Sequence, residues 1–278
     1  MPVVNGPDIL TRTMSVPVAM GKSKGMWQYH PRSDRHSKVA CWGILFYLLQ
    51  ACPLLRDQIK QGKITFGINH EMRDFKLNRR KNLDLVLCSP GSEPKPGTHF
   101  EELIDRYSIV LEERERAALK TLPQLQSTAV GTVYCALEAK ACMTEHMKAR
   151  PRLYDELNSS HQTIHGSSEM VIAVGFVMVN LAREFTSPGR AEGTVSVHRQ
   201  PEVTRQVIAK VQELPRRSAI GQEGFDAMSI SIVDCKNDGT TPVRLITEPP
   251  APQPGEIFHY DSMIRRVAHV YESRFPRI

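Results

Sequence analysis

The feature that most constrains the fold is an apolar segment, residues 131–140, that ends in two charged side chains and leads directly into a helical pattern. Its apolar residues up to Leu137 favour a β-strand, and the helical pattern that follows begins near Thr144. Glu138 and Lys140 are two residues apart, so on an extended backbone both side chains point to the same face. Burying a carboxylate beside an ammonium group is costly when the pair has no task. The end of this strand is therefore a candidate site.

A second apolar segment, residues 81–88, contains a single carboxylate, Asp84. An acid between leucine and valine side chains is costly unless it is hydrogen-bonded or holds a cation. Asp84 and Glu138 on neighbouring strands could converge on one divalent ion, with Lys140 beside it. Oxygen ligands of this kind suit Mg²⁺, which shares its coordination sphere with water and phosphate.

Asp84 followed by Glu138-Ala139-Lys140 resembles the motif of the PD-(D/E)xK nuclease superfamily, whose fold many restriction endonucleases share. The resemblance extends over about residues 64–180. Asn82-Leu83 stands before Asp84, where the family often has proline. The gap of about fifty residues between the two motif segments requires an inserted helical excursion.

The resemblance implies an α/β fold with a central mixed β-sheet flanked by helices. It implies a Mg²⁺-dependent DNA endonuclease of the restriction or defence type, with Mn²⁺ as an alternative ion. Asp84 and Glu138 would hold the metal, and Lys140 would orient or deprotonate the attacking water. Related nucleases often draw a further carboxylate from an element before the Asp strand, which makes Glu71 a candidate ligand; the alternative is a salt bridge to a neighbouring arginine. Double-stranded DNA and a homodimer are the implied partners.

Positive charge is concentrated in the first 80 residues, which carry thirteen Lys and Arg against five Asp and Glu, in a chain of net charge +6. A basic region beside an acidic site suits a polyanionic substrate, and the alternative is that the charge serves solubility alone. The candidate nucleic-acid-binding residues are Arg73, Lys76, Arg79, Arg80 and Lys81 in a predicted β-hairpin, and Lys148, Arg150 and Arg152 in the helix after the motif strand.

The chain is expected to form one domain over residues 36–278, preceded by an irregular basic arm over 1–35 that carries Lys22 and Lys24. Ser37 is expected to cap an apolar helix to Leu49. Further expectations are a helical insertion near 98–120, a loop at 189–193, and a central strand at 170–179 that is nearly all apolar. The six cysteines include no CxxC pair, and the chain starts without a signal-peptide pattern, so a cytoplasmic protein is expected.

Two rival features accompany the motif. Asp234-Cys-Lys236 is a second acid-x-Lys, but a Pro-rich loop rather than a helix follows it, and we expect a polar strand end there. His146 is a possible base, although a histidine on a polar helix is more often simply exposed. Two other functions remain open: a non-catalytic nucleic-acid-binding module on a nuclease-like fold, and a small-molecule phosphodiesterase.

Overall fold

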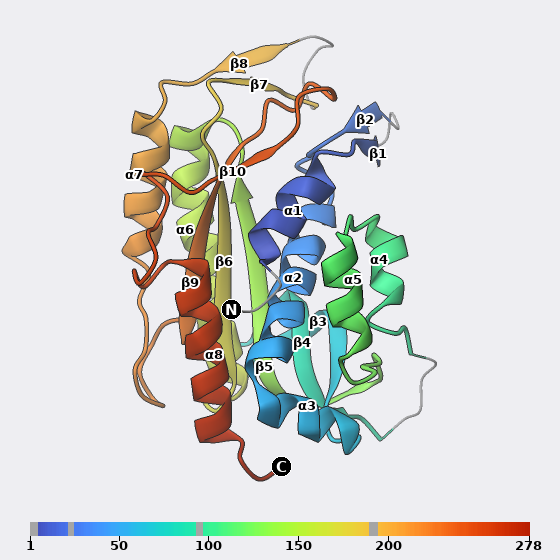
Figure 1. Cartoon of the computed structure of the whole chain (residues 1–278). Coiled ribbons are helices and arrows are strands. Elements are labelled where there is room, and N and C mark those ends of the chain that lie inside the picture. Colours follow the sequence, from blue (N-terminus) through green and yellow to red (C-terminus); the bar gives the residue numbers. More distant parts are fainter. Residues whose placement is uncertain (1–4, 22–24, 93–96, 189–193) are drawn as a thin grey trace.

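The computed structural model describes residues 5–21, 25–92, 97–188 and 194–278, so Lys22, Lys24 and the loop expected at 189–193 lie outside the described residues. The fold is α/β, as expected, with a six-stranded mixed sheet of strand order β10-β9-β6-β5-β4-β3 (Figure 1). The elements of this sheet are β3 (Thr65–Asp74), β4 (Arg79–Pro90), β5 (Val130–Cys142), β6 (Ile172–Asn180), β9 (Ala227–Asp234) and β10 (Arg244–Ile246). The β5-β6-β9 centre is parallel, and the remaining pairs are antiparallel.

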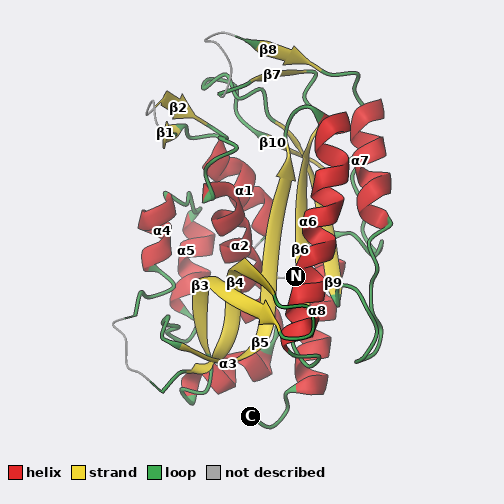
Figure 2. Cartoon of the chain, turned by 180° about the vertical axis from the view of Figure 1, so that it is seen from behind, coloured by secondary structure: helices red, strands yellow, loops and turns green. Residues whose placement is uncertain are grey.

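Helices cover both faces of the sheet (Figure 2). One face packs against α1 (Gly6–Met14), α2 (Arg35–Ala51), α3 (Pro53–Lys60), α4 (Glu102–Tyr107), α5 (Glu113–Lys120) and α8 (Tyr260–Arg274). The other face packs against α6 (His146–Ser167) and α7 (Glu202–Gln212). Two small ribbons, β1 (Val18–Met20) with β2 (Gly25–Trp27) and β7 (Glu184–Thr186) with β8 (Val195–Val197), complete the described elements. Two short helices, α4 and α5, lie in the segment for which a helical insertion was expected.

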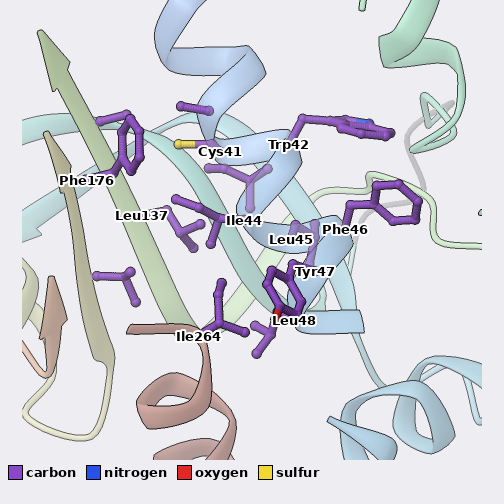
Figure 3. Packing of buried hydrophobic residues seen from close by; sticks show 14 of the residues in the cluster. Cys41, Trp42, Ile44, Leu45, Phe46, Tyr47, Leu48, Leu137, Phe176 and Ile264 are labelled. Atoms are coloured by element: carbon purple, nitrogen blue, oxygen red, sulfur yellow. The ribbon is translucent and has the colours of Figure 1, made fainter. Parts of the chain in front are cut away.

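The apolar helix predicted from Ser37 to Leu49 is α2, which lies across the middle of one face of the sheet (Figure 3). It is buried nearly all round, and Trp42 and Phe46 are fully buried. Burial of each such aromatic side chain is worth about 1.5–3 kcal/mol. The helix begins at Arg35 rather than after Ser37, and Ser37 does not act as its N-cap. Its side chain instead faces the sheet.

The described residues among the first 35 do not form an irregular arm, because they include α1, β1 and β2. α1 begins with Pro7 in its first turn, which suits a helix start, and it buries Ile9, Leu10 and Met14 in the main core. α1 lies against α2 (Figure 1). A Cβ atom added at Gly43 of α2 would lie 3.0 Å from the Cα of Gly6, so the two helices approach closely through their glycines. A helix was not expected at α1 because Gly6 lowers the helix propensity of this short segment.

Candidate active site at the fork of two strands

The candidate site lies where β4 and β5 separate. The two strands pair as far as Leu85 with Leu137. Beyond that point β4 pairs only with β3 in a long hairpin, while β5 continues beside β6 to Cys142. Asp84 and Glu138 are the next residues on the two strands, so both carboxylates lie at the opening of this fork.

Asp84 is held by three donors. The ammonium group of Lys38 and the hydroxyl group of Ser37, both on α2, donate to its Oδ1 at 2.7 and 2.9 Å. The backbone N–H of Ala139 donates to its Oδ2 at 2.9 Å. Burial raises the pKa of this carboxyl group, but Lys38 and the hydrogen bonds outweigh it, so the net pKa of Asp84 is lowered. Asp84 is therefore an ionised carboxylate at neutral pH.

Glu138 is more deeply buried, with a side chain only 2% exposed. Its Oε1 accepts a salt bridge from Lys140 at 2.7 Å, and the ammonium group of Lys81 lies 3.9 Å away. Its Oε2 is buried and has no hydrogen-bond partner. Burial raises the pKa of Glu138, and the nearby charge of Asp84 raises it further, which outweighs the two lysines. A buried carboxylate oxygen with no donor is a position at which a cation would be stabilised.

Lys140 connects the strand to helix α6. Besides Glu138, it lies 3.8 Å from the carboxylate of Glu156 on α6. Burial lowers the pKa of Lys140, but Glu138, Asp84 and Glu156 outweigh burial and raise it above the usual value. Lys140 is therefore an ammonium ion at neutral pH, which is the form that donates hydrogen bonds and stabilises negative charge.

The structure brings Asp84, Glu138 and Lys140 together but leaves Glu71 outside. Glu71 lies on the exposed part of the β3–β4 hairpin and pairs with Arg80 at 3.4 Å, as the salt-bridge alternative expected. Within the described part of the chain, no group of three or more His, Cys, Asp or Glu side chains could hold a metal ion. Glu71 thus forms the salt bridge that was its alternative, and its role as a metal ligand stays a prediction.

The donor set at the fork nevertheless fits a magnesium ion. Oε2 of Glu138 lacks a partner, and Oδ2 of Asp84 accepts one hydrogen bond. On a strand the N–H and C=O groups of one residue point to the same side, so the carbonyl oxygen of Ala139 also faces the fork. Mg²⁺ is commonly held by one or two carboxylates, with water and substrate phosphate completing its shell. These hard oxygen atoms suit that pattern.

A cleft of about 740 Å³ opens beside the fork. It lies between the N-terminal end of α2 and the N-terminal half of α6, and Asp84 and Lys140 are in its wall. Of the predicted nucleic-acid-binding residues, Lys148 and Arg152 line it, together with Arg32. Arg150 is not among the lining residues; its guanidinium lies 3.5 Å from the side chain of Gln206 on α7.

The predicted basic hairpin is present, with its basic residues distributed along its exposed part. Each side chain has a neighbour: Arg73 bonds Asn78, Lys76 lies 3.3 Å from Glu169, and Arg79 bonds Gln162 on α6. Arg80 pairs with Glu71, as described above. These residues do not line the cleft. Lys81 differs from them, since it donates to the backbone carbonyl of Glu156 and lies beside Glu138.

Two other sequence expectations concern histidine and the rival motif. His146 is buried rather than exposed: its Nε2 donates to the carbonyl of Asn180 at 2.8 Å, and burial lowers its pKa to about 4. It does not line the cleft. Asp234 of the rival motif pairs with Arg244 at 2.6 Å at the exposed end of β9, and Lys236 is exposed. The polar strand end expected there is what the structure has.

Three residues of the site were missed in the sequence. Lys38 is the most informative, because it is a cation on a nearly all-apolar helix and its side chain is only 3% exposed. Such a buried lysine requires an anionic partner, which is the signal that could have identified it. Glu156, the second, lies on α6, the helix that follows the motif strand, and its carboxylate is near Lys140. His36 lines the cleft, and burial lowers its pKa to about 4.

Comparison of the chain with protein-family models, curated proteins and solved structures found no match. Among the described helices, none is by itself long and apolar enough to cross a membrane. α2 and α3 meet that criterion only as a pair, by length and composition, and they are bent by 97° at the break between them.

Proposed function

We propose that this protein is a Mg²⁺-dependent DNA endonuclease of the restriction or defence type. The observation that carries the proposal is the fork of β4 and β5, at which Asp84, Glu138 and Lys140 gather, with Asp84 and Lys140 in the wall of one cleft. These are the residues of the PD-(D/E)xK motif, and they come from strands that separate only at this point. A buried carboxylate oxygen without a donor supports a cation there.

In this proposal Asp84 and Glu138 hold Mg²⁺, or Mn²⁺ in its place. The ion would lower the pKa of a bound water molecule and offset the charge that develops on the phosphate group. Lys140 orients the water molecule as an ammonium ion, since its raised pKa makes it a poor proton acceptor. Arg32, Lys148 and Arg152 bind backbone phosphates along the cleft.

The remaining proposals follow from the same reading. The exposed arginines of the hairpin, Arg79 and Arg80, would hold the DNA beyond the cleft. A homodimer would allow both strands to be cut. All six cysteines are free and buried, in keeping with a reducing compartment, and we propose the cytoplasm.

Two observations favour alternatives. Each site carboxylate has a lysine of its own, an arrangement that also suits a non-catalytic nucleic-acid-binding module. The cleft volume of about 740 Å³ also falls within the range of pockets for small molecules, which suits a small-molecule phosphodiesterase.

Incubation of the protein with supercoiled plasmid in Mg²⁺, and separately in EDTA, tests these functions. We expect nicked or linear plasmid in Mg²⁺ alone, and loss of cleavage in Asp84→Asn at unchanged circular dichroism. DNA binding without cleavage in either Mg²⁺ or Mn²⁺ would identify the binding module. Failure to bind DNA at all would leave the small-molecule enzyme as the better reading.

A further inference from the structure

The site contains its own counter-cations, and this bears on when a metal ion enters. Lys38 reaches Asp84 from α2, and its ammonium group also donates to the side chain of Asn69 and lies 3.3 Å from the backbone carbonyl of Asp84. Asn69 has a left-handed backbone with φ of 52°, which is uncommon for a residue other than glycine. Lys38 is thus held in place by three oxygen atoms at the point where the β3–β4 pairing skips Asn69.

The fork carries a positive net charge without a metal ion. Asp84, Glu138 and Glu156 supply three negative charges. Four positive charges lie within 4.0 Å of a carboxylate oxygen or carbonyl oxygen in the same cluster, those of Lys38, Lys81, Lys140 and Arg152. Lys38 and the other buried groups are poorly hydrated, so their interactions are weakly screened. A dication added to this cluster of net charge +1 would leave it with an excess of three positive charges.

The lysines and Ser37 also limit which oxygen atoms remain. Oδ1 of Asp84 accepts from both Ser37 and Lys38, and Oε1 of Glu138 accepts from Lys140. What remains is Oε2 of Glu138, one lone pair of Oδ2 of Asp84 and the carbonyl oxygen of Ala139. Three oxygen atoms are too few for a six-coordinate ion, so other ligands must complete the shell.

We infer that a divalent ion binds this site only together with a phosphate group of the nucleic acid, and that Lys38 sets this dependence. The inference rests on the proposed function. A phosphodiester supplies both the missing oxygen ligand and the negative charge that offsets the ion. In the absence of nucleic acid, the ammonium group of Lys38 neutralises the charge of Asp84, as the metal ion would. The coupling would keep the site free of metal until substrate is present.

The test measures Mn²⁺ binding directly, by the electron paramagnetic resonance signal of the free ion. Wild-type protein is titrated alone and with a saturating phosphorothioate DNA duplex, after subtraction of the ions that the duplex binds by itself. We expect the affinity for Mn²⁺ to be at least about tenfold higher with the duplex, because the attraction between the ion and a phosphate charge in a partly buried site is worth more than that factor. Lys38→Met, which keeps the length of the side chain but not its charge, should raise the affinity without DNA by a similar factor.

Lys120→Met is the matched control, since it removes one positive charge from an exposed position on α5 and should leave both affinities unchanged. Equal Mn²⁺ affinity of the wild type with and without the duplex would overturn the inference while leaving the nuclease intact. No site-bound Mn²⁺ in either condition would instead overturn the proposed function. The wild-type comparison alone decides the coupling even if Lys38→Met does not fold.

Discussion

The backbone N–H of Ala139 donates a hydrogen bond to Oδ2 of Asp84 at 2.9 Å. The regular pairing of β4 and β5 ends at Leu85 and Leu137, so this bond joins the two strands just beyond their last ladder pair. The side chain of Asp84 therefore closes the end of the sheet and lies beside the peptide that separates Glu138 from Lys140. The middle residue of the motif contributes through its backbone, which explains why a small residue is sufficient there.

The chemistry at Lys140 can be separated from folding and binding. Lys140→Ala should fold and still bind DNA with Mg²⁺, because the carboxylates remain. Plasmid cleavage should fall by about 10²–10⁴-fold, the range typical of a group that positions or protonates a reacting molecule.

The control is Lys236→Ala at the rival motif, where the side chain is exposed, and it should cleave plasmid at the wild-type rate. A loss of cleavage in Lys236→Ala with full activity in Lys140→Ala would show that the chemistry belongs to the rival motif at the end of β9, and that the proposal chose the wrong strand. Equal losses in both variants would point to a general effect on folding, which circular dichroism would reveal.

The sequence predicted what depends on local pattern. Alternation and apolar runs identified the strands, and the Glu138-x-Lys140 spacing placed both side chains on one face, where they form a salt bridge. The helical segment near 98–120 and the basic hairpin could also be predicted, because both depend on residues that are close together in the chain.

What could not be predicted depends on pairs far apart in the chain. Lys38 and Asp84 are 46 residues apart and meet only because α2 crosses the sheet beside β4. The exclusion of Glu71 depends on how the hairpin curves away from β5, which strand propensity does not specify. The burial of His146 follows from its bond to Asn180 on a strand that comes later in the chain.

The exposed arginines of the β3–β4 hairpin should contribute to DNA affinity without reading sequence. Arg79→Ala combined with Arg80→Ala should weaken binding to all duplexes alike and reduce the slope of log affinity against log salt by about 2, since each lost phosphate contact accounts for about 0.9. Fluorescence anisotropy at several salt concentrations measures both. The same double substitution at Arg114 and Arg116 on α5 is matched in charge and should change little. An unchanged slope in the hairpin variant would show that its arginines serve only as surface charge.

Asp226 should matter for stability rather than for chemistry. Its fully buried carboxylate accepts from Arg217 at 2.9 Å and from Arg274 at 2.5 Å. Asp226→Ala leaves two buried guanidinium groups without their anion, which should lower the free energy of unfolding by about 3–5 kcal/mol. Asp234→Ala breaks only an exposed pair with Arg244 and should cost about 0–1 kcal/mol. Urea unfolding compares the two, and a similar midpoint for both variants would contradict the assignment.

Acid should destabilise the protein through its buried histidines. Burial lowers the pKa of His36, His146, His161 and His165 to about 4 in the folded protein, whereas an unfolded histidine titrates near its usual value of about 6.5. Between those values the unfolded chain binds more protons, so the free energy of unfolding falls as pH drops from about 6.5 to about 4. Each histidine adds up to about 1.4 kcal/mol per pH unit to that fall. Urea titrations at several pH values measure the slope, which His146→Gln should reduce by about one quarter. His269→Gln, at an exposed position on α8, should leave the slope unchanged, and a wild-type stability that is flat across this range would exclude the mechanism.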